Sequence, residues 1–194
     1  RRRLAAKYGR GPETPPEDDC KAFSVALAEA YFAGVREEFK KAAPNKLYMG
    51  CRFCGFPDFV VTAAAKYVDV LSFNYYHKDV TDFPQLPDGV DKPIVIGEFH
   101  FGATDRGPFG TGVRQAKDQA DRAAKMKAYV ESALANPQIV GVHWHQFSDQ
   151  ATTGRFDGEY FQVGFTDVCD TPYAETVKAL REVGESLYTA RWEK

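Results

Sequence analysis

Apolar residues recur with two different periods along this sequence. Over residues 21–43 large apolar side chains repeat every fourth residue, which predicts a helix with one buried stripe made of Phe23, Leu27, Tyr31, Val35 and Phe39. Similar spacing predicts helices over residues 57–67, 115–135 and 172–190. Short apolar runs bounded by turn residues predict strands over residues 46–53, 68–75, 93–99 and 139–147.

The predicted elements are one helix followed by alternating strands and helices. The strands are almost continuously apolar, which is typical of strands buried on both faces of a parallel sheet. This alternation predicts an α/β fold in which helices cross over between parallel strands. Residues 1–20 are polar and rich in proline and acidic side chains, so we expect a loop there, with Asp18 or Asp19 as the N-cap of the first helix.

The ends of the predicted strands distinguish between the parallel architectures. The sequence contains neither G-x-G-x-x-G nor G-x-x-x-x-G-K-[ST], so a doubly wound nucleotide-binding sheet lacks its phosphate loop. Polar and aromatic side chains follow all four strands instead, as they do at the catalytic face of a (β/α)8 TIM barrel. Such a barrel takes about 250 residues. We therefore interpret residues 21–194 as its C-terminal half, units five to eight, with residues 1–20 leading in from a missing upstream half.

Glu98 is the strongest catalytic candidate. It ends an apolar strand, where a carboxylate is costly unless it is hydrogen-bonded or paired with a charge. Arg52 and Tyr76 stand at the ends of other predicted strands, and we expect them to reach Glu98 and hold it ionised, as a nucleophile requires. The alternative interpretation is a structural ion pair at the end of a strand.

Strict alternation along the strands predicts which side chains share a face. The groups are Ile94, Ile96, Glu98 and His100; Val142, Trp144 and Gln146; Ser72, Asn74 and Tyr76; and Tyr48, Gly50 and Arg52. Trp144 could form an apolar floor for a sugar ring, with a core aromatic as the alternative. We predict substrate contacts from residues at the strand ends and in the last long loop: Arg52, Asn74, Tyr76, His100, Trp144, Gln146 and Asp149.

Composition and charge exclude some classes of function. The 194 residues carry a net charge of −2, so an excess of positive charge for nucleic-acid binding is absent. No run of 18 apolar residues predicts a membrane span. Cys51 and Cys54 form a C-x-x-C pair without the second pair that a closed zinc site needs, and His143 and His145 should face away from Trp144. We therefore expect no metal and no other cofactor.

Several segments resemble the β-agarases of glycoside hydrolase family 50, in the order in which that family has them. They are residues 46–53 (KLYMGCRF), 73–76 (FNYY), 96–103 (IGEFHFGA) with 105–107 (DRG), 144–149 (WHQFSD) and 153–173. The likeness extends from about residue 17 to residue 190. It implies a retaining (β/α)8 glycosidase that cleaves β-galactosidic linkages in agarose, with Glu98 as the nucleophile.

The sequence departs from that family in one respect. The acid/base glutamate normally follows an Asn at the end of the fourth strand, and this sequence has no Asn-Glu pair. Since retaining hydrolysis needs two carboxyl groups about 5–5.5 Å apart, we expect a fragment that is inactive or weakly active alone. A catalytically inactive carbohydrate-binding protein and a β-galactosidase of the same clan remain alternatives.

A half barrel also leaves its first and last strands as open edges. We expect the missing N-terminal half, or self-association, to cover them. The chain begins at Arg1 and shows no leader, so its compartment stays open. Because agarose cannot enter a cell, an extracellular or periplasmic parent enzyme is expected.

Overall fold

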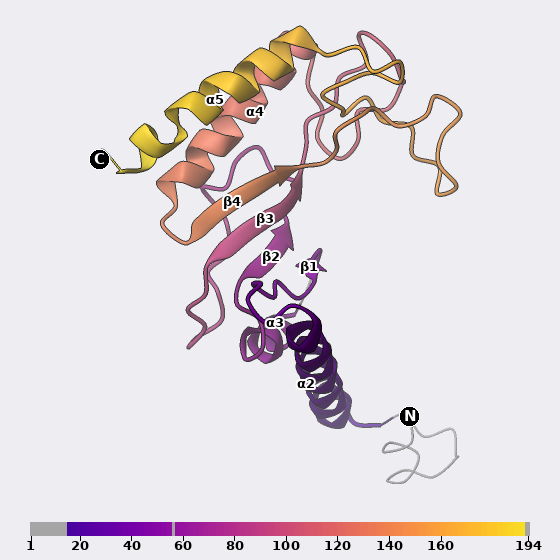
Figure 1. Ribbon diagram of the computed structural model, residues 1–194. Helices are drawn as coiled ribbons and strands as arrows, with labels where there is room; N and C mark the ends of the chain where they lie inside the picture. Colours follow the sequence, from indigo (N-terminus) through magenta and orange to yellow (C-terminus); the bar gives the residue numbers. More distant parts are fainter. Residues whose placement is uncertain (1–14, 56, 193–194) are drawn as a thin grey trace. The chain divides into compact units, whose positions relative to one another are not determined.

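The computed structural model describes residues 15–55 and 57–192, which fall into two compact units (Figure 1). The first comprises the described parts of residues 1–50, 55–70 and 86–91, and the second those of residues 51–54, 71–85 and 92–194. Within this described part, no helix has both the length and the apolarity that crossing a membrane requires.

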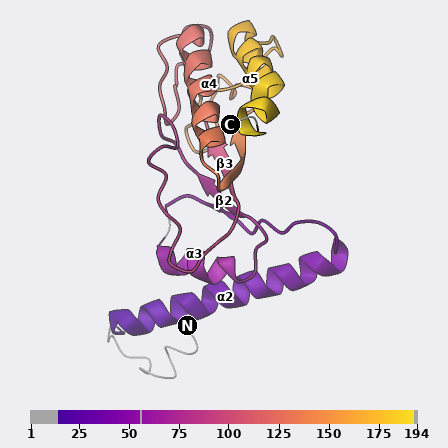
Figure 2. The same cartoon turned by 90° about the vertical axis from the view of Figure 1, so that its left-hand side faces the viewer.

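The first unit is built on two helices that lie side by side, α2 (Glu17–Ala42) and α3 (Asp58–Ala65) (Figures 1 and 2). Helix α2 begins directly after Pro16, with acidic residues in its first turn and lysines in its last. Both charge groups stabilise the helix dipole. A proline at position 57 precedes α3, as expected at a helix start.

Helix α2 differs from the sequence-based prediction in two ways. It begins at Glu17, so Asp18 and Asp19 lie in its first turn instead of capping it, and residues 17–20 are helical rather than loop. The predicted buried stripe is largely open: Leu27, Tyr31 and Val35 are 59%, 55% and 38% exposed. The reason is that α3, with only 8 residues, is too short to cover a helix of 26 residues within this unit.

Asp69 ties the end of α2 to the segment that follows it. Its carboxylate accepts a hydrogen bond from the backbone N–H of Tyr48 at 2.8 Å and pairs with Arg36 at 3.0 Å and with Lys40 at 3.1 Å. The Tyr48 hydrogen bond, supported by the two cations, lowers the pKa of Asp69 to about 2.

The second unit contains a sheet of four parallel strands in the order β1-β2-β3-β4. The strands are β1 (Arg52–Phe53), β2 (Leu71–Asn74), β3 (Ile94–Phe99) and β4 (Ile139–Trp144). This confirms the predicted α/β sheet of four parallel strands. Strand β1 is much shorter than the predicted strand 46–53, since only residues 52–53 pair with β2.

Helices α4 (Gln119–Ala135) and α5 (Ala174–Trp192) lie side by side over one face of this sheet (Figure 1). Asp118 caps α4 by accepting a hydrogen bond from the backbone N–H of Asp121 at 2.8 Å. The ring of Phe99 on β3 stacks on Tyr129 of α4 at 4.0 Å between centroids. Phe99 therefore points toward the helices.

A bulge in β3 changes the alternation just before Glu98. Ser72 pairs with Val95 and Phe73 with Ile96, but Asn74 pairs with Glu98, which leaves Gly97 as an extra residue. A Cβ atom at Gly97 would lie 2.5 Å from Arg52 Cδ and 2.6 Å from Ser72 Oγ, so glycine is required where these side chains pass.

The bulge places Glu98 on the face that carries Arg52 and Ser72, and Ile96 on the opposite face. The prediction that Ile94, Ile96 and Glu98 share one face is therefore wrong. Simple period-two alternation could not reveal this, because one inserted residue inverts the pattern beyond it.

Candidate active site

The carboxyl ends of the first three strands bring together three side chains of the predicted site. Glu98 Oε1 pairs with Arg52 Nη1 at 2.7 Å, and Glu98 Oε2 accepts a hydrogen bond from the Tyr76 hydroxyl at 2.7 Å. Both contacts were expected from the positions of Arg52 and Tyr76 at the ends of predicted strands. The Glu98 side chain is 15% exposed, so it is largely shielded but still reached by solvent.

The partners of Glu98 hold both of its carboxylate oxygens. A cation and a hydroxyl donor each bind a different carboxylate oxygen, so neither oxygen lacks a donor. Burial, and then the hydrogen bond to Glu98, raise the pKa of Tyr76 well above its usual range, which keeps the phenol protonated as a donor.

His100 does not offer a nitrogen to a ligand, contrary to its predicted role in substrate binding. It is 2% exposed. Its Nε2 accepts a hydrogen bond from the backbone N–H of Val113 at 2.9 Å, so the ring proton resides on Nδ1, which donates to the carbonyl oxygen of His145 at 3.1 Å. Burial, followed by repulsion from His145, lowers the pKa of His100 to about 4, and the ring is neutral.

Trp144 is also placed differently from the prediction. It pairs with Phe99 in the sheet register and contacts that ring edge-on at 5.3 Å, on the side of the sheet that faces the helices. Its Nε1 donates to the carbonyl oxygen of Val163 at 2.6 Å, and its ring packs against Phe165 at 5.5 Å. These contacts support the alternative interpretation of Trp144, which is a core aromatic.

Asp149 is a buried structural carboxylate in this fold, at 6% exposure. It accepts hydrogen bonds from the Tyr173 hydroxyl at 2.6 Å and from the Gly164 N–H at 2.7 Å. Burial raises its pKa despite these donors. Because both oxygens bind within the protein, the predicted contact with substrate is not available.

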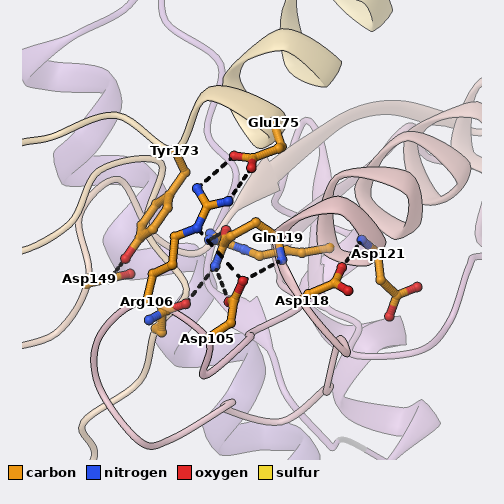
Figure 3. Close-up of polar contacts among 10 residues, drawn as sticks. Asp105, Arg106, Asp118, Gln119, Asp121, Asp149, Tyr173 and Glu175 are labelled. Carbon is orange, nitrogen blue, oxygen red and sulfur yellow. Dashed lines mark hydrogen bonds and ion pairs between the residues drawn. The ribbon is translucent and has the colours of Figure 1, made fainter.

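Asp149 belongs to a polar cluster that joins the long loops to the helices (Figure 3). In this view Tyr173 points to Asp149, Arg106 to Glu175 and Gln119 to Asp105, the last pair at 3.0 Å. Arg122, with 0% exposure, donates to the carbonyl oxygens of Phe101 and Gly164. The loops that follow β3 and β4 are thereby held together from inside.

Asn74 and Gln146 lie near the strand ends, and both residues are half-buried. Asn74 lies opposite Glu98 in the register of β2 and β3, and its buried Oδ1 has no hydrogen-bond partner among the described residues. Gln146 is half-buried, and its Nε2 donates to the Ser148 carbonyl oxygen at 2.8 Å, which leaves its Oε1 as an acceptor. A buried carbonyl oxygen without a partner is costly and accepts a hydroxyl donor favourably.

Sequence reasoning missed the part of the 102–114 loop that folds back over the strand ends. Gly112 has a φ of 67°, and Arg114 Nε donates to the carbonyl oxygen of Tyr76. The four glycines of this loop were the available signal, but they indicated a flexible loop and not the surface against which His100 packs. Among the described residues, no group of three or more His, Cys, Asp or Glu is placed to hold a metal ion.

Comparison with known proteins gives related sequences over nearly the whole chain, although no family model matches it. The chain is 44% identical to Beta-agarase B of Vibrio sp. (strain JT0107) over 174 residues, and 42% identical to Beta-agarase A of the same strain over 182 residues. These alignments cover 87% and 89% of this chain but 18% of each relative. The chain therefore spans about a fifth of the length of the curated relatives that it matches.

Solved structures of agarases are also similar to this chain. An exo-beta-agarase superposes with a TM-score of 0.80 at 45% identity, over 86% of this chain and 23% of its own. The agarase AgWH50C superposes with a TM-score of 0.83 at 38% identity, over 98% of this chain and 30% of its own. A beta-galacturonidase from Eisenbergiella tayi, at 18% identity and a TM-score of 0.57, shares the fold alone.

The parallel sheet and these neighbours define the chain as part of a glycoside-hydrolase barrel of the (β/α)8 type. The identities of 38–45% identify it more narrowly as a segment of the β-agarases of glycoside hydrolase family 50.

Proposed function

We propose that the enzyme containing this chain is a retaining β-glycosidase of agarase type that cleaves β-galactosidic linkages in agarose, with Glu98 as its nucleophile. The observation that carries the proposal is the geometry of Glu98, whose two oxygens are bound by Arg52 and Tyr76 at the carboxyl end of a parallel strand. Active sites of (β/α)8 enzymes lie at that end of the strands. The agarase relatives supply the substrate class.

In this proposal Glu98 attacks the anomeric carbon of the galactosyl unit. The bond to the leaving sugar oxygen breaks while a bond from a Glu98 oxygen to the anomeric carbon forms, and a second carboxylic acid protonates the leaving oxygen. Water, deprotonated by that second group, then displaces Glu98 and restores its carboxylate. Arg52 and Tyr76 orient the carboxylate before the attack.

The second carboxyl group is proposed to come from outside these 194 residues. No Asn-Glu pair occurs in the sequence, and retaining hydrolysis needs a carboxyl group about 5–5.5 Å from the nucleophile. Loss of general acid–base assistance costs typically 10²–10⁴-fold in rate. The chain alone is therefore expected to release little or no sugar from agarose.

Substrate hydroxyls are proposed to meet Asn74 and Gln146 beside Glu98. The Asn74 Oδ1 lacks a donor among the described residues and is closed to solvent, so a sugar hydroxyl would reach it only after a neighbouring side chain moves. His100, Trp144 and Asp149 are not retained as sugar contacts, because their polar atoms bind within the protein.

The decisive experiment is to replace Glu98 in the complete enzyme. We expect Glu98→Gln to lower kcat by about 10⁴-fold or more while binding of an agarose tetrasaccharide is retained. Glu98→Ala should regain turnover with added azide, which takes the vacated space and yields a glycosyl azide of inverted, α configuration. Glu131→Ala, which removes an exposed carboxylate of α4, is the matched control and should leave turnover unchanged.

The outcomes separate this proposal from its alternatives. Normal turnover in Glu98→Gln, or a β-configured azide product, would refute Glu98 as nucleophile. A complete protein that binds agarose without releasing reducing sugar would be a carbohydrate-binding protein. Hydrolysis of a small aryl galactoside with agarose left intact would indicate a β-galactosidase.

A further inference from the structure

The side chain of Tyr76 is the only uncharged partner of Glu98 in the contacts of the described residues, and its own position has to be maintained. Its ring lies edge-on against the imidazole of His100, with 4.7 Å between centroids and 61° between planes. Its backbone carbonyl oxygen accepts a hydrogen bond from Arg114 Nε. Two groups outside β2 therefore hold Tyr76 in place.

His100 is itself held on three sides. Val113 N–H and the His145 carbonyl oxygen bind its two ring nitrogens, as described above. The backbone of Gly112 presses on the ring so closely that a Cβ atom there would lie 2.3 Å from Nε2. Such a ring has one orientation and one tautomer, and its edge is presented to Tyr76.

We propose that His100 is a positioning residue for Glu98, acting through the ring of Tyr76, and that it makes no contact with the sugar. The sequence of contacts runs from Gly112 and Val113 to His100, from His100 to Tyr76, and from Tyr76 to Glu98 Oε2. A tilted or displaced Tyr76 ring would move its hydroxyl away from Glu98. Displacements of about 1 Å are enough to lower catalytic rates 10²-fold.

This inference rests on the proposed function, since it assigns a role relative to Glu98 as nucleophile. The role of His100 and the role of Glu98 as nucleophile can nevertheless be refuted separately. Azide rescue of Glu98→Ala tests the nucleophile without changing His100. The experiments below compare variants of His100 with one another and with Tyr76→Phe.

The first experiment is a double-mutant cycle in the complete enzyme with His100→Ala, Tyr76→Phe and the double variant. We expect each single substitution to lower kcat by about 10-fold or more with KM changed less than about threefold, since transition-state stabilisation is lost. The double variant should be no slower than about threefold below the slower single variant, because both act on the same hydrogen bond. Multiplicative losses, or a higher KM with kcat unchanged, would overturn the proposal.

A pair of matched variants distinguishes the two possible roles of the ring. His100→Phe keeps an aromatic edge against Tyr76 and removes both nitrogens, whereas His100→Asn keeps a hydrogen-bonding group and removes the ring. If His100 positions Tyr76, His100→Phe retains more kcat than His100→Asn, with melting temperatures measured for both. The opposite order would show that the hydrogen bonds of the nitrogens, and not the ring edge against Tyr76, sustain turnover, and it would overturn the proposal.

A measurement on the unmodified ring covers the case in which these variants fail to fold. Nitrogen NMR of the His100 imidazole in the complete Glu98→Gln protein should show a protonated Nδ1 and an unprotonated Nε2. Both signals should stay unchanged when an agarose tetrasaccharide is added to saturation. An Nε2-protonated tautomer, or nitrogen signals that change with the sugar, would overturn the inference.

Discussion

Burial decides, residue by residue, which polar side chains near the strand ends are free for chemistry. Glu98 keeps 15% of its side chain exposed and has its two oxygens held by donors, an arrangement that suits a reactive carboxylate. His100 and Asp149 are also residue types that could bind a ligand. Both are nearly inaccessible to solvent, however, and their polar atoms form hydrogen bonds within the protein. Residue identity alone could not separate these cases.

The buried neutral state of His100 predicts a pH dependence of stability. Burial lowers its pKa from 6.5 to about 4, so below pH 6.5 the unfolded chain binds a proton that the folded chain does not. The free energy of unfolding should therefore fall as the pH drops from 6.5 toward 4, by up to about 3 kcal/mol, and this contribution should level off below pH 4. Urea denaturation at several pH values measures it.

His100→Phe is the control, because it lacks the titrating group. Asp69 acts in a separate window: its pKa of about 2 stabilises the folded state above pH 3.8, and this stability is lost as the pH falls through 2. An equal slope between pH 6.5 and 4 in the parent chain and in His100→Phe would contradict the assignment.

Among the elements, the loops that follow the strands contribute more to the site than the helices do. The loop after β3 returns to the end of its own strand, where Gly102 N–H donates to the Arg114 carbonyl oxygen at 2.8 Å. The loop after β4 meets it through Gln162 N–H, which donates to the Gly110 carbonyl oxygen at 2.8 Å. Together they enclose His100 and leave Glu98 accessible.

We predict that Gly112→Ala destabilises the chain more than Gly158→Ala does. Both glycines have positive φ, 67° and 87°, so an alanine at either position costs about 1 kcal/mol of backbone strain. Only at Gly112 would the new Cβ clash, 2.3 Å from His100 Nε2, whereas nothing lies within 4 Å at Gly158. The clash should add about 1–3 kcal/mol.

Urea denaturation of the two variants measures the difference, and kcat of the complete enzyme should fall in Gly112→Ala alone. If both variants lose the same free energy of unfolding, the loop does not press on His100 as described.

For the whole molecule, large apolar surfaces are left open on each unit. In the second unit an apolar groove of about 400 Å³ lies between β4, α4 and α5, with Val140, Tyr188 and Trp192 exposed by 59%, 73% and 77%. In the first unit the open stripe of α2 includes Leu27 and Tyr31. Contiguous apolar patches of this kind mark interaction surfaces or aggregation sites.

We predict that the isolated 194-residue chain self-associates or is only marginally stable, because these apolar surfaces and the sheet edges lack partners among the described residues. Light scattering should give a mass above 21.7 kDa. Val140→Lys with Trp192→Lys should weaken the association, while Phe156→Lys, at a loop residue that is 99% exposed, should not. A well-folded monomer in solution would contradict this prediction.

Much of the fold followed from local pattern. The period of the apolar residues gave the order and type of the helices and strands in residues 15–55 and 57–192, and the absence of hairpin signals gave the parallel sheet. Element ends were less accurate, as in β1, because hydrogen-bond pairing with a neighbouring strand decides where a strand ends. The stripe of α2 was predicted as buried because periodicity identifies an apolar face and not what covers it.

The sequence by itself determined that Glu98 ends a buried strand near Arg52 and Tyr76, since strand order and strand ends are set by local composition and parallel connections. The tertiary structure alone decided which neighbouring side chains remain open to a ligand. Gly97 inverts the alternation before Glu98, a distant loop closes over His100, and Trp144 turns to the helices. Each of these outcomes depends on contacts between residues far apart in the chain, and no local period contains that information.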